Sequence, residues 1–159
     1  MNIFLPYTDD VIKSIQSLDD KRLKKQIIEC HVMKSLHEHP EIKKGFANHP
    51  VVQHYTRDKR QYKFLCYYGY QCCKEYEFRF ERPHAYSSEF PKTCYFGQPG
   101  YQPLYVEGRK DSHAQIRSIN SIEVGQLFRE KLIYKWDHDK LTPKWTKRDM
   151  PKFYKEEER

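Results

Sequence analysis

The sequence has no Gly-rich phosphate loop, no Ser or Cys nucleophile motif, no HExxH motif and no clustered pair of carboxylates. These absences disfavour the enzyme classes that depend on such motifs. Its five cysteines are an odd number without a CxxC pair, which predicts neither a disulfide framework nor a cysteine zinc site and fits a reducing compartment. No apolar run approaches the ~20 residues of a transmembrane helix, and Met1 to Pro6 is too short for a signal peptide. We therefore expect a cytoplasmic protein, in the host cytoplasm if it is viral.

Positive charge and aromatic side chains are plentiful. The chain has 29 Lys and Arg against 22 Asp and Glu, a net charge of +7, and 15% aromatic residues, 13 of them Tyr. This combination favours a nucleic-acid partner, with an ordinary solvated basic surface as the alternative. At 159 residues, we expect one compact domain that is mainly α, with two major helices, shorter helices and long irregular loops.

The stretch from Leu18 to Leu36 predicts a helix with polar groups on an inward face. Asp19 or Asp20 suits the N-cap, and two apolar stripes follow at helical spacing. The stripes consist of Leu23, Ile27 and Cys30, and of Ile28, Val32 and Leu36. Between the stripes lie Arg22, Gln26 and Glu29. We therefore expect Glu29 in a partly desolvated seam, where a Glu is rarely found without a charged or hydrogen-bonding partner or a functional role. The alternative is an ordinary ion pair between Lys25 and Glu29.

The remaining chain divides into segments of distinct character. Residues 1–7 predict an extended arm, 80–111 a long Pro/Gly/Tyr loop and 135–159 a basic aromatic tail. Helices are expected from Val11 to Leu18, from Pro50, from about Asp58 to Phe78, from near His113 with Ile116 and Ile119 inward, and from Ser121. The small residues Gly69, Cys72 and Cys73 should let another helix approach closely. His37 and His39 could suggest a metal, but two His at a helix end usually bind nothing, and we expect none.

Three motifs in the first half of the chain, taken together, resemble the pyrimidine-dimer DNA glycosylase (endonuclease V) family. They are Phe4-Leu5-Pro6-Tyr7, the run from Leu18 to Glu29, and Asn48-His49-Pro50. The resemblance implies a cofactor-independent glycosylase with abasic lyase activity, in which an amine attacks the sugar C1′ and forms a Schiff base. In that family an α-amine exposed by removal of the initiator Met is the nucleophile, and the essential carboxylate aligns with Glu29.

The attacking amine is left open among three residues. An α-amino group is ~14% neutral at pH 7 and an ordinary Lys only ~0.04%, which favours the chain terminus. Position 2 is Asn, whose size disfavours Met removal, so the amine belongs either to Met1 or to Asn2. Lys25, one turn from Glu29, is the third candidate if its pKa is lowered.

The expected partner is double-stranded DNA with a damaged or modified base, bound by a monomer without membrane or metal. Phosphates or the flipped nucleotide would be held by Arg22, Gln26 and His49. Further DNA contacts are expected from basic and aromatic positions along the chain, namely Arg57, Lys59, Arg60, His113, Arg117, Trp145 and Lys147. The target could be a pyrimidine dimer or a modified base. The alternatives from other classes are a non-enzymatic DNA-binding protein and an interaction module without a nucleic-acid role.

Overall fold

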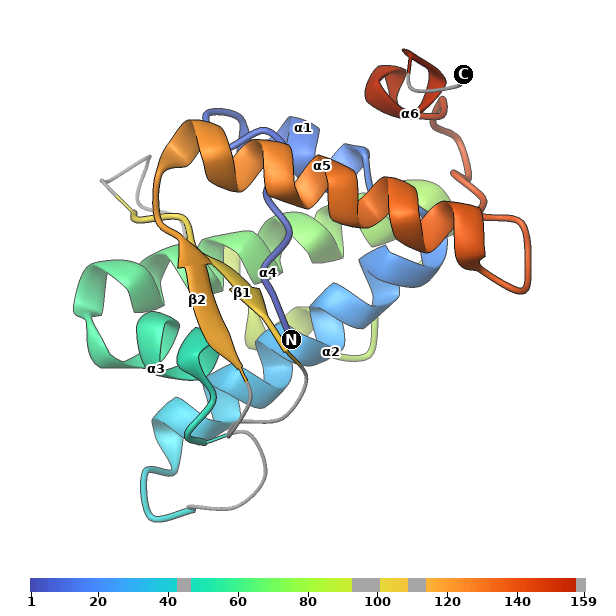
Figure 1. Ribbon diagram of the computed structural model, residues 1–159. Coiled ribbons are helices and arrows are strands. Elements are labelled where there is room, and N and C mark those ends of the chain that lie inside the picture. Colours follow the sequence, from blue (N-terminus) through green and yellow to red (C-terminus); the bar gives the residue numbers. More distant parts are fainter. Residues whose placement is uncertain (43–46, 93–100, 109–113, 157–159) are drawn as a thin grey trace.

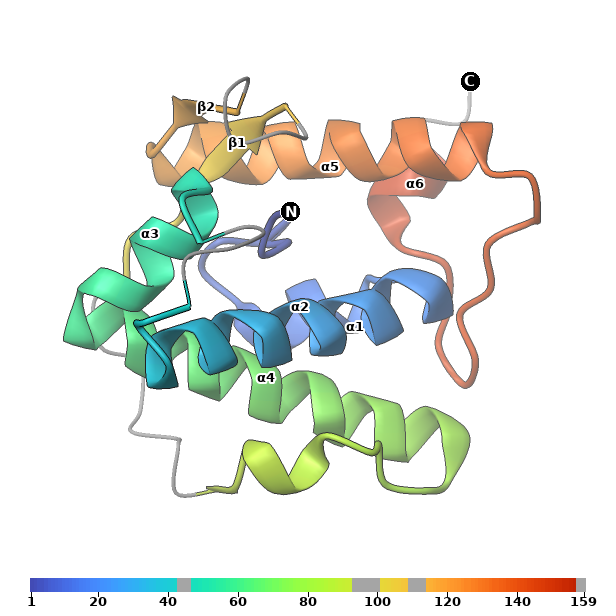
Figure 2. The same ribbon diagram turned by 90° about the horizontal axis from the view of Figure 1, so that it is seen from below.

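The computed structural model describes residues 1–42, 47–92, 101–108 and 114–156, and its fold is mainly helical, as predicted. The helices are α1 (Val11–Gln16), α2 (Asp20–Glu38), α3 (Pro50–Arg57), α4 (Lys59–Phe80), α5 (Ser121–His138) and α6 (Lys152–Glu156). A 3-10 turn, η1 (Ser87–Glu89), follows α4, and a small antiparallel sheet joins β1 (Tyr105–Glu107) to β2 (Gln115–Ser118). Figure 2 shows three levels: α5 with the sheet, then α2, then α4.

The amino-terminal arm lies inside the molecule. Residues 2–6 are buried without regular secondary structure, and they run between α5 and α2 (Figures 1 and 2). The ring of Phe4 packs edge-on against Phe128 of α5, with 5.4 Å between the centroids. Burial of this apolar segment favours the folded state. It also fixes where the first residue of the chain lies.

Aspartates stand at the N-cap of three helices, among them α2, whose predicted N-cap is confirmed in position. The side chains of Asp10 and Asp58 accept backbone N–H bonds at the starts of α1 and α4. Asp19 is the N-cap of α2, but its carboxylate makes no capping bond and instead accepts a hydrogen bond from Trp136 Nε1 at 2.8 Å. The start of α2 is therefore tied to α5, which no local sequence pattern reports.

Helix α2 packs chiefly on α4, through a fully buried layer that includes Cys30 and Cys72. Burial raises the pKa of both thiols well above the ordinary value, so they stay protonated. They pack as small apolar groups, the role predicted for the cysteines of α4. The close approach predicted at Gly69 also occurs, but the partner is the ring of Phe90, which follows η1, and not a helix.

Replacing Gly69 with Ala is expected to destabilise the protein. A Cβ at this position would lie 2.6 Å from two ring atoms of Phe90, which is fully buried. Overpacking of this kind costs about 1–3 kcal/mol, against a gain in helix propensity of about 1 kcal/mol, so we expect a net loss of up to about 2 kcal/mol. Urea unfolding measures it. If Gly69→Ala costs as much in a Phe90→Leu background, contact with the ring is not the cause.

Two expectations about isoleucines were wrong. The segment predicted to form a helix near His113 contains β2, and Ile116 and Ile119 are 56% and 54% exposed. Their spacing of three suits a helix, but the backbone of residues 115–118 pairs with β1 instead. Ile28, assigned to the second apolar stripe of α2, is 48% exposed, whereas Val32 and Leu36 of the same stripe are half-buried.

Within the described residues, no helix has the length and apolar character to span a bilayer. Nor do three or more His, Cys, Asp or Glu side chains gather in a possible metal site within those residues. The ring of His37 stacks on Tyr62 at 3.6 Å, and its Nδ1 lies 3.1 Å from the carbonyl oxygen of Thr56. Nδ1 of His39 lies 3.5 Å from the carboxylate of Glu41. Each of the two histidines therefore has a protein partner.

Candidate active site

Gln26 is the residue that holds the arm against α2. It is 1% exposed, and both N–H groups of its side-chain amide donate, to the carbonyl oxygen of Asn2 at 2.9 Å and to Glu29 Oε2 at 3.0 Å. Its Oε1 accepts from the backbone N–H of Phe4 and lies 2.9 Å from the hydroxyl of Tyr68. All of its hydrogen-bonding groups thus have protein partners, as a buried amide requires. In this position Gln26 orients the arm and Glu29, and it has no donor left for DNA.

Asn2 fastens the arm on its other side. The carboxamide of Asn2 donates to the carbonyl oxygen of Val106 at 3.1 Å and accepts from the N–H of Val106 at 3.3 Å. A side chain thus imitates the pairing of a neighbouring strand at β1. Residue 2 is held between β1 and α2, so residue 1 lies at the edge of the inward face of α2. Met1 and Glu29 are both half-buried there, and we call the place where they meet the seam.

The α-amine of Met1 and the carboxylate of Glu29 interact electrostatically. Burial lowers the pKa of the amine, the charge of Glu29 opposes this, and the nearby lysines Lys25, Lys135 and Lys131 lower it further. Burial raises the pKa of Glu29, while the amine, Lys25, the backbone of Asn2 and the amide of Gln26 oppose the rise. The seam therefore contains an amine that deprotonates more readily than usual beside a carboxyl group that binds a proton more readily than usual.

The lysines around this pair come from two helices. Lys25 is exposed on α2, one turn before Glu29, and among the ion pairs of the described residues none joins the two. Lys131 and Lys135 lie four residues apart on α5, and Lys131 also pairs with Glu107 of β1 at 3.8 Å. The sequence did not single out either α5 lysine as a site residue. Their spacing places them on one helix face, but no sequence signal indicated that this face meets the amino terminus.

The guanidinium of Arg22 is paired with two carboxylates. Its guanidinium makes a two-pronged ion pair with Asp139, just after α5, and lies 3.4 Å from Asp19. The hydrogen bond with Asp139 raises the pKa of Arg22 and lowers that of Asp139. This part-buried pair ties the first turn of α2 to the end of α5. In this arrangement Arg22 supports the helix that carries Gln26 and Glu29 and does not offer its charge to a phosphate.

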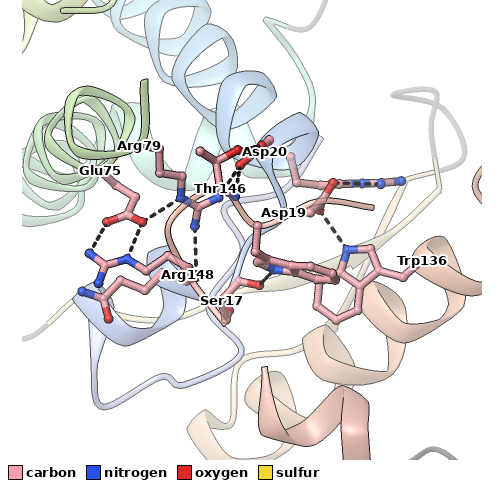
Figure 3. Close-up of polar contacts among 11 residues, drawn as sticks. Ser17, Asp19, Asp20, Glu75, Arg79, Trp136, Thr146 and Arg148 are labelled. Carbon is pink, nitrogen blue, oxygen red and sulfur yellow. Dashed lines mark hydrogen bonds and ion pairs between the residues drawn. The ribbon is translucent and has the colours of Figure 1, made fainter. Parts of the chain in front are cut away.

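A second network holds the segment after α5 against α2 and α4 (Figure 3). Glu75 bridges two arginines, accepting from Arg79 Nε at 2.7 Å and from two nitrogens of Arg148 at 2.9 Å each. Arg79 also donates to Asp20 at 3.0 Å, and the backbone N–H of Thr146 donates to the same carboxylate. Losing one partner of such a buried network is strongly destabilising, so it fixes the start of α2.

The aromatic residues of the tail serve packing in this structure. Nε1 of Trp145 donates to the carbonyl oxygen of Ser17 at 2.9 Å, and its ring packs edge-on against the buried Trp136. Phe153 is also buried and stacks on Trp136. Trp145, interpreted from the sequence as a DNA contact, here helps to attach the tail to the core.

The structure separates the other predicted DNA-binding residues into two groups. His49 is fully buried, and its Nδ1 accepts from Val51 N–H as the N-cap of α3. His113 lies outside the described residues. The exposed cations are Arg57, Lys59 and Arg60 at the junction of α3 and α4, Arg117 on β2, and Lys147, which pairs with Glu81 at 3.2 Å. Only this second group offers charge at the surface among the predicted residues that the structure describes.

A family model for pyrimidine dimer DNA glycosylases matches residues 1–85, more than half of the chain, and the protein belongs to this family. Membership implies glycosylase activity on DNA that contains pyrimidine dimers. A search of the curated proteins and a search of the solved structures gave no match. The matched residues include the arm, Gln26 and Glu29, whereas α5 with its two lysines lies beyond them.

Proposed function

We propose that this protein removes pyrimidine dimers by a glycosylase step followed by an abasic lyase step, with the α-amine of residue 1 as nucleophile and Glu29 as the acid–base group. The observation that carries the proposal is the placement of the arm, which brings the α-amine beside a half-buried carboxylate. No cofactor is needed for this chemistry. The proposal requires that residue 1 carry the free amine of the chain, which intact-mass measurement determines.

The first step is attack of the neutral amine on the sugar C1′. The amine nitrogen forms a bond to C1′, and the glycosidic bond breaks with its electron pair leaving on the base. Loss of a proton from nitrogen and opening of the sugar ring then give a protonated imine. An ordinary α-amine is already about 14% neutral at pH 7, and the lowered pKa at Met1 increases that fraction. Lys25 has no comparable burial, since its side chain is exposed.

Glu29 would serve both steps by moving protons. Its carboxylate can stabilise positive charge at C1′ as the base leaves, and its acid form can protonate the ring oxygen as the sugar opens. In the lyase step it can take the C2′ proton, and the electron pair then expels the 3′ phosphate. Water finally hydrolyses the imine and frees the amine. The raised pKa of Glu29 suits a group that must both accept and return a proton near neutral pH.

DNA binding would depend on the cations around the seam and on those further out. Lys25, Lys131 and Lys135 surround the reacting pair and are suited to the phosphates beside the lesion. Exposed cations at the α3–α4 junction and on β2 can hold the flanking duplex. Exposing the sugar costs a few kcal/mol of unstacking, and this cost is smallest at damaged sites. We propose a monomer as the acting species.

Borohydride trapping tests the proposal, because the imine is reducible. A duplex with one cyclobutane dimer, and a second with an abasic site, should each give a covalent protein–DNA adduct that peptide mapping places at residue 1 or 2. The same protein with Lys25→Met should give the same adduct. An adduct at Lys25 would move the nucleophile to α2. If neither these duplexes nor those with modified bases yield an adduct, the protein binds DNA without this chemistry.

A further inference from the structure

The outer strand of the small sheet presents an apolar side chain to solvent. Gln115, Ile116 and Arg117 are all exposed, although a strand that lies flat on a core alternates between buried and exposed residues. Among the described residues β2 pairs with β1 alone, so it forms an edge of the sheet. Ile116 is 56% exposed. Single exposed isoleucines are common on protein surfaces. A functional role for Ile116 must therefore be argued from its position.

That position is beside the candidate active site. Ile116 lies directly opposite Val106 in the register of the two strands. Val106 in turn holds the carboxamide of Asn2 through two hydrogen bonds. Strand β1 thus lies between Ile116 and Asn2, the residue next to the α-amine. Figure 1 shows the same arrangement, with the amino terminus beside the lower end of β1.

We infer that Ile116 is a wedge that enters the base stack of duplex DNA where the target nucleotide leaves it. This inference rests on the proposed function, since a wedge is needed only if a nucleotide is flipped. Flipping leaves a gap in the stack. Proteins that bend DNA frequently insert Ile, Leu, Phe or Met between base steps, so an exposed Ile has the chemistry to fill such a gap. The neighbouring Arg117 is exposed and can hold a phosphate beside the inserted side chain. An exposed apolar side chain next to a cation is therefore better suited to contact with DNA than to exposure to solvent.

The test compares duplex with single-stranded substrate. Ile116→Thr keeps a β-branched residue in the strand but replaces the ethyl group of the side chain with a hydroxyl. Ile116→Leu keeps the apolar volume. The matched control is Ile122→Thr, because Ile122 is exposed on the first turn of α5, outside the sheet. Each variant is assayed on one dimer-containing sequence, both as a duplex and as a single strand. A 2-aminopurine next to the dimer reports unstacking by its fluorescence, and thermal unfolding reports stability.

Ile116→Thr should cleave the duplex about tenfold more slowly, because the energy of the flipped state rises by about 1.4 kcal/mol. It should cleave the single strand at the wild-type rate, and it should lose the fluorescence increase on the duplex. Ile116→Leu and Ile122→Thr should behave like the wild type. Equal losses on both substrates would show that Ile116 only stabilises the strand, and no loss on the duplex would also overturn the wedge.

Two further outcomes are distinguishable. If the wild type cleaves neither substrate, the proposed function fails, and the fluorescence alone tests the wedge. A fluorescence increase that depends on Ile116 then supports a wedge in a DNA-binding protein. The absence of such an increase overturns the wedge. If Ile116→Thr does not fold, Ile116→Val removes a single methyl group and should show a smaller loss confined to the duplex. An Ile116→Val protein that matches the wild type in both readouts would contradict the inference.

Discussion

An uncleaved extension of the amino terminus is expected to abolish strand cleavage, with a loss of roughly 10³-fold or more, as for other enzymes that lose a nucleophile. The extension converts the α-amine into an amide, whose nitrogen cannot attack C1′. The surface cations are unchanged, so binding of the duplex should stay within about threefold, a change under ~1 kcal/mol. Cleavage is measured under single-turnover conditions, and binding by fluorescence anisotropy at one fixed salt concentration.

The control for this experiment carries the same added sequence at the carboxyl end. That protein should cleave like the wild type, which separates loss of the amine from the effect of extra residues. The extended protein should also give no borohydride adduct. The arm places Asn2 between Val106 and Gln26, so residues added before Met1 must leave the seam toward solvent, and their effect on the fold should be small. Full cleavage by the extended protein would contradict the assignment and would make Lys25 the first residue to replace.

The sequence predicted α2 well because the signals of this helix are local. Capping residues and helical spacing predicted its start, and the angular positions placed Gln26 and Glu29 on an inward face. What lies opposite that face depends on tertiary packing. Gln26 was therefore interpreted as a DNA contact, whereas its donors go to Asn2 and Glu29. Ile28 shows the same limit, because the helix angle alone could not show that its side faces solvent.

The second half of the chain was harder to predict for two physical reasons. Helical spacing at Ile116 and Ile119 competed with pairing to β1, and the pairing partner lies about ten residues away across a segment without a periodic pattern. Basic and aromatic residues near the carboxyl end have the composition of a DNA-binding surface. Composition cannot show that Trp145 is bonded to Ser17 and packed on Trp136. The predicted role of Lys147 in DNA binding stays a prediction.

Replacing Glu29 with Gln is expected to reduce cleavage by about 10²–10⁴-fold, the usual contribution of an acid–base group, with fold and DNA binding retained. Gln has nearly the shape of Glu, and its Oε1 can still accept the bond from Gln26 Nε2. The charge of Glu29 raises the pKa of the α-amine, so removing it leaves more of the amine neutral. The variant therefore has a more available nucleophile, and its loss of activity must come from the missing carboxylate.

Glu38→Gln is the matched control, because Glu38 lies on the same helix and pairs with Lys34 at the surface, away from the seam. It should cleave like the wild type and lose only about 0.3–0.5 kcal/mol of stability. Single-turnover rates on a dimer-containing duplex, with thermal unfolding and anisotropy for each variant, make the comparison. If Glu29→Gln retains activity within about threefold of the wild type, the change in barrier is under ~1 kcal/mol. Glu29 would then serve only to hold Gln26 and the arm in place.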